Sequence, residues 1–131
     1  MFVDRFDPLA GVLWVRARAF GPLGGKDLRL ILDTGTVVTV LDTAVLDALG
    51  YSARMATARS SLLGVDGAQE GYRLSLDRFE ALGFALDGCS VLCHDFDERL
   101  GVDGLIGMDL LAGRVVTIDG IRGLLTVESQ G

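Results

Sequence analysis

The sequence predicts an all-β domain, mostly β with two short helices, folded as a partly closed β-barrel. Half of the 131 residues are apolar, which is enough to build one hydrophobic core. The chain has 18 glycines and only 2 prolines, a ratio typical of short strands joined by tight turns. Residues 13–20 alternate apolar and mixed side chains, as a half-buried strand does. We find no linker and no low-complexity stretch, so residues 1–131 are read as a single domain.

The first strands lead to an acidic turn. Residues 1–9 are too apolar for a free tail and are expected to dock onto the fold. Glycine and proline within residues 21–27 predict a turn after the first strand. The next strand, residues 28–32, is mostly apolar and runs directly into Asp33. A carboxylate at a point where apolar strands converge is costly unless it is used or neutralised, so Asp33 needs an explanation.

A short helix and a hairpin are expected after this turn. Asp42 can cap a helix that ends at Gly50 and whose apolar side holds Val45, Leu46 and Leu49. Residues 55–63 and 68–79 flank an Asp-Gly pair, which between extended segments predicts a hairpin.

The remaining elements are short. The sequence predicts a turn at residues 80–83, strands at 84–86 and 89–94, an exposed loop at 95–101, a helical turn at 108–112, and a terminal hairpin of 114–119 and 122–127.

The charge balance limits the partners. A formal net charge of −6 and a pI near 4.6 argue against nucleic acid or an anionic membrane as a partner. The first residues mix acid and base and do not resemble a signal peptide. The chain also lacks an apolar run long enough to span a bilayer. We therefore expect a cytoplasmic protein with no membrane partner.

The two cysteines are expected to be buried, reduced thiols. On one strand, Cys89 and Cys93 would share a face but lie roughly 13 Å apart, too far for a disulfide. Together with His94 they form Cys-x-x-x-Cys-His, but a structural metal site would need a further ligand from elsewhere. We predict no metal and no cofactor.

Two motifs resemble those of a known family. Leu32-Asp33-Thr34-Gly35 resembles the catalytic loop of the aspartic proteases, specifically the single-lobe, retropepsin-like kind. Leu105-Ile106-Gly107, followed by Met108-Asp109-Leu110-Leu111, resembles the segment that packs behind that loop in the family. The resemblance covers nearly the whole chain and implies a retropepsin-like barrel, equivalent to one lobe of the pepsin fold.

This resemblance implies a homodimeric peptidase. Two carboxylates that share one proton can activate water and protonate the leaving amine, as the acid pair of an aspartic protease does. The sequence holds only one Asp-Thr/Ser-Gly motif, so the second acid must be Asp33 of another copy, related by twofold symmetry. The expected substrate is a peptide or protein. The N-terminal residues 1–9 and the strand 122–127 are the expected interface.

The family also suggests roles for the residues around Asp33. Thr34 would bond across the twofold axis, and Gly35 would let the substrate backbone approach. Thr36 carries a hydroxyl that can donate to Asp33, which favours the ionised form and tunes the titration of the acid pair. Loop support would come from Thr39 together with the segment Leu105, Ile106 and Gly107.

The hairpin has the position of the family's flap, which closes over the substrate. Its tip residues are Leu63, Gly64, Val65, Asp66 and Gly67. An ordinary surface hairpin is the alternative. Viral members commonly place an acid two residues after the glycine of the motif, where this chain has Val37, so the substrate subsites differ from theirs.

Two other functions fit parts of the pattern. Asp33-x-Gly35-Thr36-x-x-Thr39 also matches the phosphate-binding loop of the actin and sugar-kinase type, although that fold needs two large lobes and leaves Leu105-Ile106-Gly107 unexplained. A non-catalytic dimerisation or peptide-binding module on the same fold is the second alternative. An intact Asp33-Thr34-Gly35 favours the enzyme.

Overall fold

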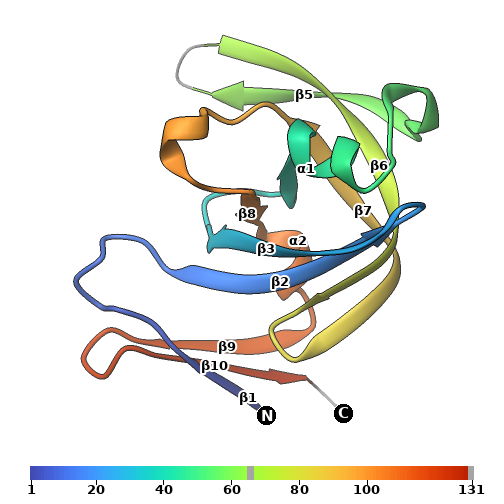
Figure 1. The fold of residues 1–131 in the computed structure, drawn as a ribbon. Coiled ribbons are helices and arrows are strands. Elements are labelled where there is room, and N and C mark those ends of the chain that lie inside the picture. Colours follow the sequence, from blue (N-terminus) through green and yellow to red (C-terminus); the bar gives the residue numbers. More distant parts are fainter. Residues whose placement is uncertain (65–66, 130–131) are drawn as a thin grey trace.

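The computed structural model describes residues 1–64 and 67–129, and a β-barrel dominates it (Figure 1). Six strands form a ring in the order β2-β3-β8-β4-β7-β6, which closes because β2 also pairs with β6. β5 extends the sheet beyond β6, and a separate three-stranded sheet has the order β1-β10-β9. This confirms the predicted mostly β barrel with two short helices.

The elements follow in this order: β1 (Phe2–Arg5), β2 (Trp14–Gly21), β3 (Gly24–Leu32), β4 (Val40–Asp42), α1 (Thr43–Ala48), η1 (Ala53–Met55), β5 (Ala58–Gly64), β6 (Gly67–Ala81), β7 (Phe84–His94), η2 (Glu98–Leu100), β8 (Gly104–Ile106), α2 (Met108–Leu111), β9 (Arg114–Asp119) and β10 (Leu124–Ser129).

Alternation along β2 and β3 builds one wall of the core. Val15, Ala17 and Ala19 of β2 are buried, whereas Arg16 and Arg18 between them are exposed. On β3 the buried residues are Leu28, Leu30 and Leu32. Successive strand residues point to opposite faces, so one face of this sheet packs inward and the other meets solvent. Most of the predicted turn at residues 21–27 is strand, because β2 and β3 pair as far as Gly21 and Gly24.

Helix α1 forms where it was expected, but Asp42 does not cap it with its side chain. Asp42 occupies the N-cap position with extended backbone, and its carboxylate instead accepts the backbone N–H of Phe96 at 3.2 Å. Val45, Leu46 and Leu49 are buried, and Gly50 ends the helix with a φ of +92°. The Asp42 carboxylate therefore links the start of α1 to the segment after β7.

The two short strands predicted at 84–86 and 89–94 are one continuous strand, β7. Asp87 and Gly88 fall between the two predicted strands, yet pairing with β6 keeps the same register on both sides, at Asp87 and at Cys89. Gly88 adopts a φ of +66°, which glycine tolerates, so the strand bends without ending. The long β6–β7 pair that results joins the barrel to the hairpin of β5 and β6.

The N-terminal segment docks as predicted. β1 pairs antiparallel with β10, with Phe2 opposite Val127, and the N–H of Phe6 donates to the carbonyl of Gly123 at 2.9 Å. Leu125 and Val127 of β10 are buried against the barrel. In Figure 1 this sheet lies below the barrel and the β5–β6 hairpin lies above it.

Both cysteines lie on β7 as buried free thiols, as expected. Burial raises the pKa of Cys89 to about 11, so its thiol stays protonated at neutral pH. The Sγ of Cys93 lies 3.1 Å from the hydroxyl of Thr43. Within the described residues, no helix is long and apolar enough to cross a membrane.

Candidate active site

Asp33 is the first residue after strand β3. β3 pairs in parallel with β8, so Leu32 lies beside Ile106. The pairing continues one residue further, since the N–H of Asp33 donates to the carbonyl of Ile106 at 2.9 Å. The β3–β4 loop that starts at Asp33 lies between the β5–β6 hairpin and the three-stranded sheet (Figure 1). Backbone hydrogen bonds therefore position Asp33 independently of the contacts of its side chain.

Two short hydrogen bonds orient the Asp33 carboxylate. Its Oδ1 accepts the N–H of Gly35 at 2.9 Å, and its Oδ2 accepts the hydroxyl of Thr36 at 2.8 Å. The N–H of Thr36 also donates to the carbonyl of Asp33 at 3.2 Å, which closes the turn. The hydrogen bond expected from Thr36 is therefore present. Thr34 and Gly35 are exposed and Asp33 is half-buried, so the loop presents its acid to solvent.

Thr39 joins the loop to the segment behind it. It is the only polar residue among the described ones that is fully buried, with 0 % exposure. Its hydroxyl donates to Asp109 Oδ1 at 2.8 Å and accepts the N–H of Gly107 at 3.1 Å, while its own N–H donates to Asp109 Oδ2 at 3.0 Å. These three bonds connect positions about seventy residues apart, and they leave neither the hydroxyl nor the N–H unpaired.

Backbone contacts complete this connection. The N–H of Met108 donates to the carbonyl of Thr36 at 2.8 Å, and the N–H of Asp109 donates to the carbonyl of Val37 at 3.1 Å. A Cβ on Gly107 would lie 2.6 Å from the backbone of Val38, so only glycine fits there. Leu105, Ile106 and Gly107 therefore lie directly behind the loop, where the sequence placed them.

Asp109 is the site residue that sequence reasoning missed. The sequence places Asp109 two residues after Gly107, but the motif alone predicts no role for this acid. The signal was available, because an acid at the second position of a short helix can accept backbone N–H groups. In the structure one Asp109 oxygen serves the N–H of Leu110 and the hydroxyl of Thr39 together.

The hairpin forms as expected, with Leu63 opposite Ala68 and Gly64 opposite Gly67. Val65 and Asp66, at the predicted tip, lie outside the described residues. Val37 is 77 % exposed beside the acid, in agreement with a side chain that takes no part in holding the loop. Among residues 1–64 and 67–129, no group of three His, Cys, Asp or Glu side chains could hold a metal ion.

Comparison with protein families identifies the family of this chain. Residues 21–110 match the family described as aspartyl protease. The chain belongs to the aspartyl protease family. The match spans both the Asp33-Thr34-Gly35 loop and Leu105-Ile106-Gly107, whereas the nucleotide-loop alternative uses only the first. A search of curated protein sequences found no match.

Solved structures share the fold of this family member. A retropepsin-like aspartic protease from Rickettsia conorii aligns with a TM-score of 0.70 and 18% identity, covering 97% of this chain and 89% of that one. The EIAV protease in complex with the inhibitor HBY-793 aligns with a TM-score of 0.61 and 22% identity, covering 81% of this chain and 90% of that one. The predicted retropepsin-like fold is therefore confirmed.

The substitution Thr39→Val tests the connection behind the loop. It keeps the shape of the side chain but removes the hydroxyl, which leaves the buried N–H of Gly107 without its acceptor. We expect the free energy of unfolding to fall by about 1–3 kcal/mol, measured by urea denaturation at fixed protein concentration. Thr57→Val, at an exposed hydroxyl, is the control and should change stability by less than about 0.5 kcal/mol. Equal effects of the two variants would contradict this role of Thr39.

Proposed function

We propose that this protein is an aspartic endopeptidase that acts as a homodimer, with one Asp33 from each subunit. The supporting observation is a carboxylate oriented on both oxygens, in an exposed loop braced from behind, and encoded once per chain. One such acid can be either a base or an acid, but peptide hydrolysis without a metal needs both at once. A second copy supplies the second acid, because twofold symmetry brings the same loop to the axis.

The two acids would divide the chemistry between them. Like charges about 3 Å apart do not both ionise easily, so the pair holds one shared proton. The ionised Asp33 takes a proton from water, whose oxygen attacks the peptide carbonyl carbon. The protonated Asp33 of the other subunit donates to the departing amine nitrogen as the C–N bond breaks. The titration belongs to the pair, and neither subunit is assigned a fixed role.

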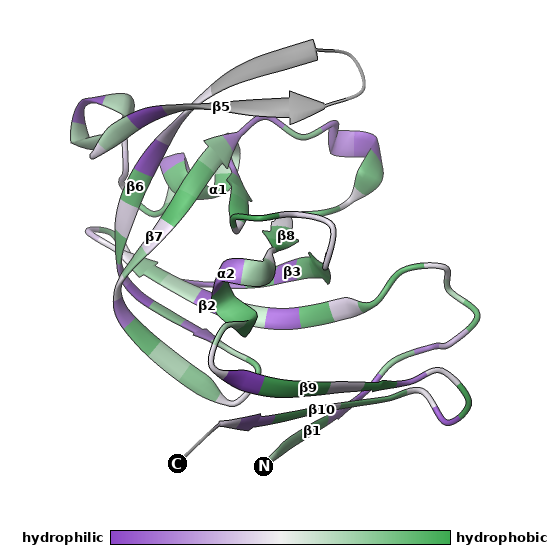
Figure 2. Ribbon diagram, turned by 180° about the vertical axis from the view of Figure 1, so that it is seen from behind, coloured by the Kyte–Doolittle hydropathy of each residue, from purple (hydrophilic) through white to green (hydrophobic). Residues whose placement is uncertain are grey.

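The three-stranded sheet offers the edges for a subunit interface. We expect the interface in residues 1–9 and the strand 122–127. Most of 122–127 is β10, which has β1 on one side and β9 on the other, so both of its own edges are paired. Only β1 and β9 have an open edge in this sheet. β9 is strongly hydrophobic along its middle (Figure 2), with Val115 51 % and Ile118 48 % exposed. An uncovered apolar edge strand invites pairing with another strand, so we propose β9 as the contact with the second copy.

The β5–β6 hairpin is proposed as the flap. It projects from the barrel on the same side as the loop that carries Asp33 (Figure 1). Exclusion of water is the usual role of such a lid, since it strengthens the electrostatic interactions of the enclosed acids.

Asp33→Asn tests the acid itself. Asparagine keeps the shape but cannot share a proton, so turnover of a mixed peptide library should fall by about a thousandfold or more. The variant should remain folded, as judged by circular dichroism. Asp47→Asn, on the exposed side of α1, removes the same charge and should retain full activity. Turnover of Asp33→Asn near that of the wild type would refute the mechanism.

Val115→Glu together with Ile118→Glu tests the proposed interface. The twofold axis would bring the introduced charges of both subunits together, and like charges facing each other across strands are destabilising. We expect sedimentation at micromolar concentration to show a dimer for the wild type and a folded monomer for the variant. Hydrolysis should be lost with the dimer. An active monomer of either protein would overturn the proposal.

Thr36→Ala tests how the carboxylate is oriented. The Thr36 hydroxyl donates to Asp33 Oδ2 at 2.8 Å, and alanine removes this donor but keeps the backbone bond that closes the turn. A hydrogen bond to a charged group contributes about 1.5–3 kcal/mol, so we expect turnover of the peptide library to fall by roughly tenfold to a hundredfold. Turnover like that of the wild type in a folded, dimeric variant would show that Thr36 does not orient the acid.

A further inference from the structure

Strand β7 supports only part of the β5–β6 hairpin. β6 pairs with β7 between Ala81 and Tyr72, and the last pair joins Tyr72 to Cys93. Beyond Tyr72, residues 67–71 of β6 pair only with β5, which has no other strand partner in the described chain. A two-stranded ribbon is marginally stable in water by itself. Residues 60–64 and 67–71, here named the ribbon, therefore leave the barrel without further strand support (Figure 1).

Packing against the core reaches as far as the same position. Leu76 and Leu74 of β6 belong to the core, with 0 % and 1 % exposure. Tyr72 follows on the same face of the strand, because strand side chains alternate, and it is half-buried against the core. These three side chains anchor β6 to the barrel. A hinge of the hairpin therefore has to lie beyond Tyr72, where movement pulls none of them out of the core.

Polar side chains from three elements meet at this position. The hydroxyl of Thr43, the first residue of α1, lies 3.1 Å from the Sγ of Cys93, which is 2 % exposed. Burial, together with a hydrogen bond to the Cys93 side chain, raises the pKa of Tyr72, so its hydroxyl stays protonated at neutral pH. Thr43, Tyr72 and Cys93, here named the base cluster, therefore join α1, β6 and β7 at the point where the ribbon begins.

Gly71 is the first residue of β6 beyond this anchor. A Cβ on Gly71 would lie 2.7 Å from the carbonyl oxygen of Cys93 and 3.3 Å from Leu92 Cδ1. A backbone oxygen in a paired strand cannot move aside as the end of a side chain can, so only glycine lets β6 pass this close to β7. Glycine also has the widest choice of backbone dihedral angles, which suits a residue that absorbs a change of angle.

The end of β7 is also bound to the support of the candidate acid. The N–H of Leu92 donates to the carbonyl of Thr39 at 2.9 Å, and Leu41 lies beside Cys93 in the β4–β7 pair. Thr39 in turn connects the β3–β4 loop to the segment behind it. Leu92 and Cys93, which lie against Gly71, therefore belong to the part of the barrel that holds Asp33.

We propose that Gly71 is the hinge of the β5–β6 hairpin and that the base cluster holds the hairpin to the barrel on the inner side of this hinge. The inference rests on the proposed function, because it gives the proposed flap its point of rotation. The ribbon changes its angle at Gly71, while β7 and the β3–β4 loop keep their positions. A substrate can then enter and a product leave without breaking the hydrogen bonds that orient Asp33.

Amide hydrogen exchange of the free protein tests the hinge without any need for activity. Ribbon amides should exchange at least tenfold faster than those of residues 74–81 of β6, because opening at Gly71 breaks no contact in the core. Ribbon amides as slow as those of residues 74–81 would overturn the inference.

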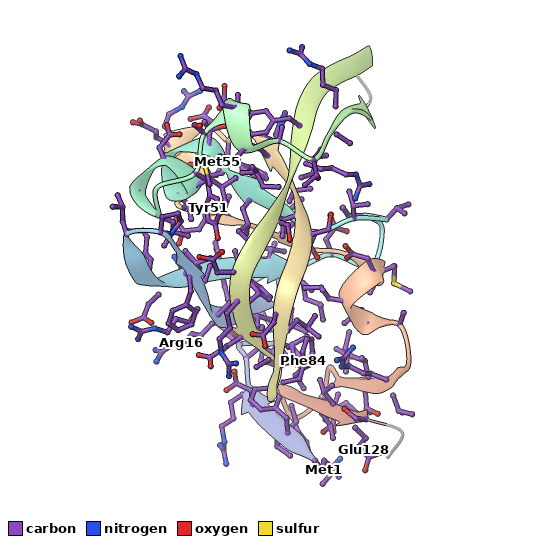
Figure 3. The ribbon with its side chains drawn as sticks, turned by 90° about the vertical axis from the view of Figure 1, so that its right-hand side faces the viewer. Met1, Arg16, Tyr51, Met55, Phe84 and Glu128 are labelled. Carbon is purple, nitrogen blue, oxygen red and sulfur yellow. The ribbon has the colours of Figure 1, made fainter. Side chains whose placement is uncertain are left out.

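The two tyrosines of the chain form a matched pair of variants. The hydroxyl of Tyr51 donates to the carbonyl of Phe20 at 2.7 Å and accepts the N–H of Asp77 at 2.8 Å, and Tyr51 lies above β2 and β3 in Figure 3. Tyr72→Phe should speed exchange of the ribbon at least threefold and leave β2 and β3 unchanged. Tyr51→Phe should speed exchange in the barrel instead. Equal acceleration of the ribbon in both variants would contradict the role of the base cluster.

Gly71→Ala tests the close approach to β7. The added methyl group meets a backbone oxygen, so the ribbon has to shift; its amides should exchange at least threefold faster, and kcat/KM for a peptide substrate should fall at least tenfold. Gly120→Ala is the matched control, because a Cβ there meets no atom within 4 Å, and it should change neither value. Faster ribbon exchange in Gly71→Ala supports the hinge even if no peptide is cleaved, in which case the proposed function alone fails. Ribbon exchange equal to that of Gly120→Ala would overturn the hinge.

Discussion

The hydroxyl of Thr39 is the interaction on which the site depends. It is buried completely and takes part in two hydrogen bonds, one to a carboxylate and one from a backbone N–H. A buried polar group costs free energy unless it is paired, so this hydroxyl requires both segments to be in place at once. The bonds of Thr39 therefore connect the β3–β4 loop to the segment behind it, and the same hydrogen bonds stabilise both.

The β3–β4 loop gives each chain one oriented carboxylate, that of Asp33. Its acid is held by donors from the same four-residue turn, which makes the orientation of the carboxylate a local property of the chain. The chemistry of two coupled acids is not local, because it requires a second loop within a few ångströms. The three-stranded sheet, at the opposite side of the barrel from the hairpin, has an open apolar edge on β9. In the proposed homodimer, the loop would supply the acid and this edge would contact the second copy.

Much of the fold was predictable because the signals are local. Alternation identified β2, and the apolar run of β3 followed by Asp33 identified the central turn. Two motifs also predicted that Asp33 directly follows a strand and that residues 105–107 pack behind its loop. The predictions that were wrong depended on contacts between segments that lie far apart in the sequence. Asp87-Gly88 has the composition of a turn, yet pairing with β6 on both sides keeps β7 continuous. Aspartate often caps helices, yet the Asp42 carboxylate accepts the backbone N–H of Phe96, which lies outside helix α1.

Asp109 was missed for a physical reason. Its carboxylate accepts the hydroxyl and the N–H of Thr39, seventy residues earlier in the chain. A single sequence does not show which distant residues come into contact. Local patterns predict which residues are buried or exposed, whereas a contact between distant positions depends on how the strands pair.

The way in which the loop is braced has a consequence for how the protein can diversify. At Thr36 and Val37 the bonds to α2 use backbone carbonyls, so they persist whatever side chain is present. Gly107 on the other side has no room for any substitution. A side-chain substitution is therefore sterically blocked behind the acid, at Gly107, whereas at Val37 it leaves the backbone bonds to α2 in place. In the proposed enzyme, the side chain next to the acid can thus change while the acid keeps its position.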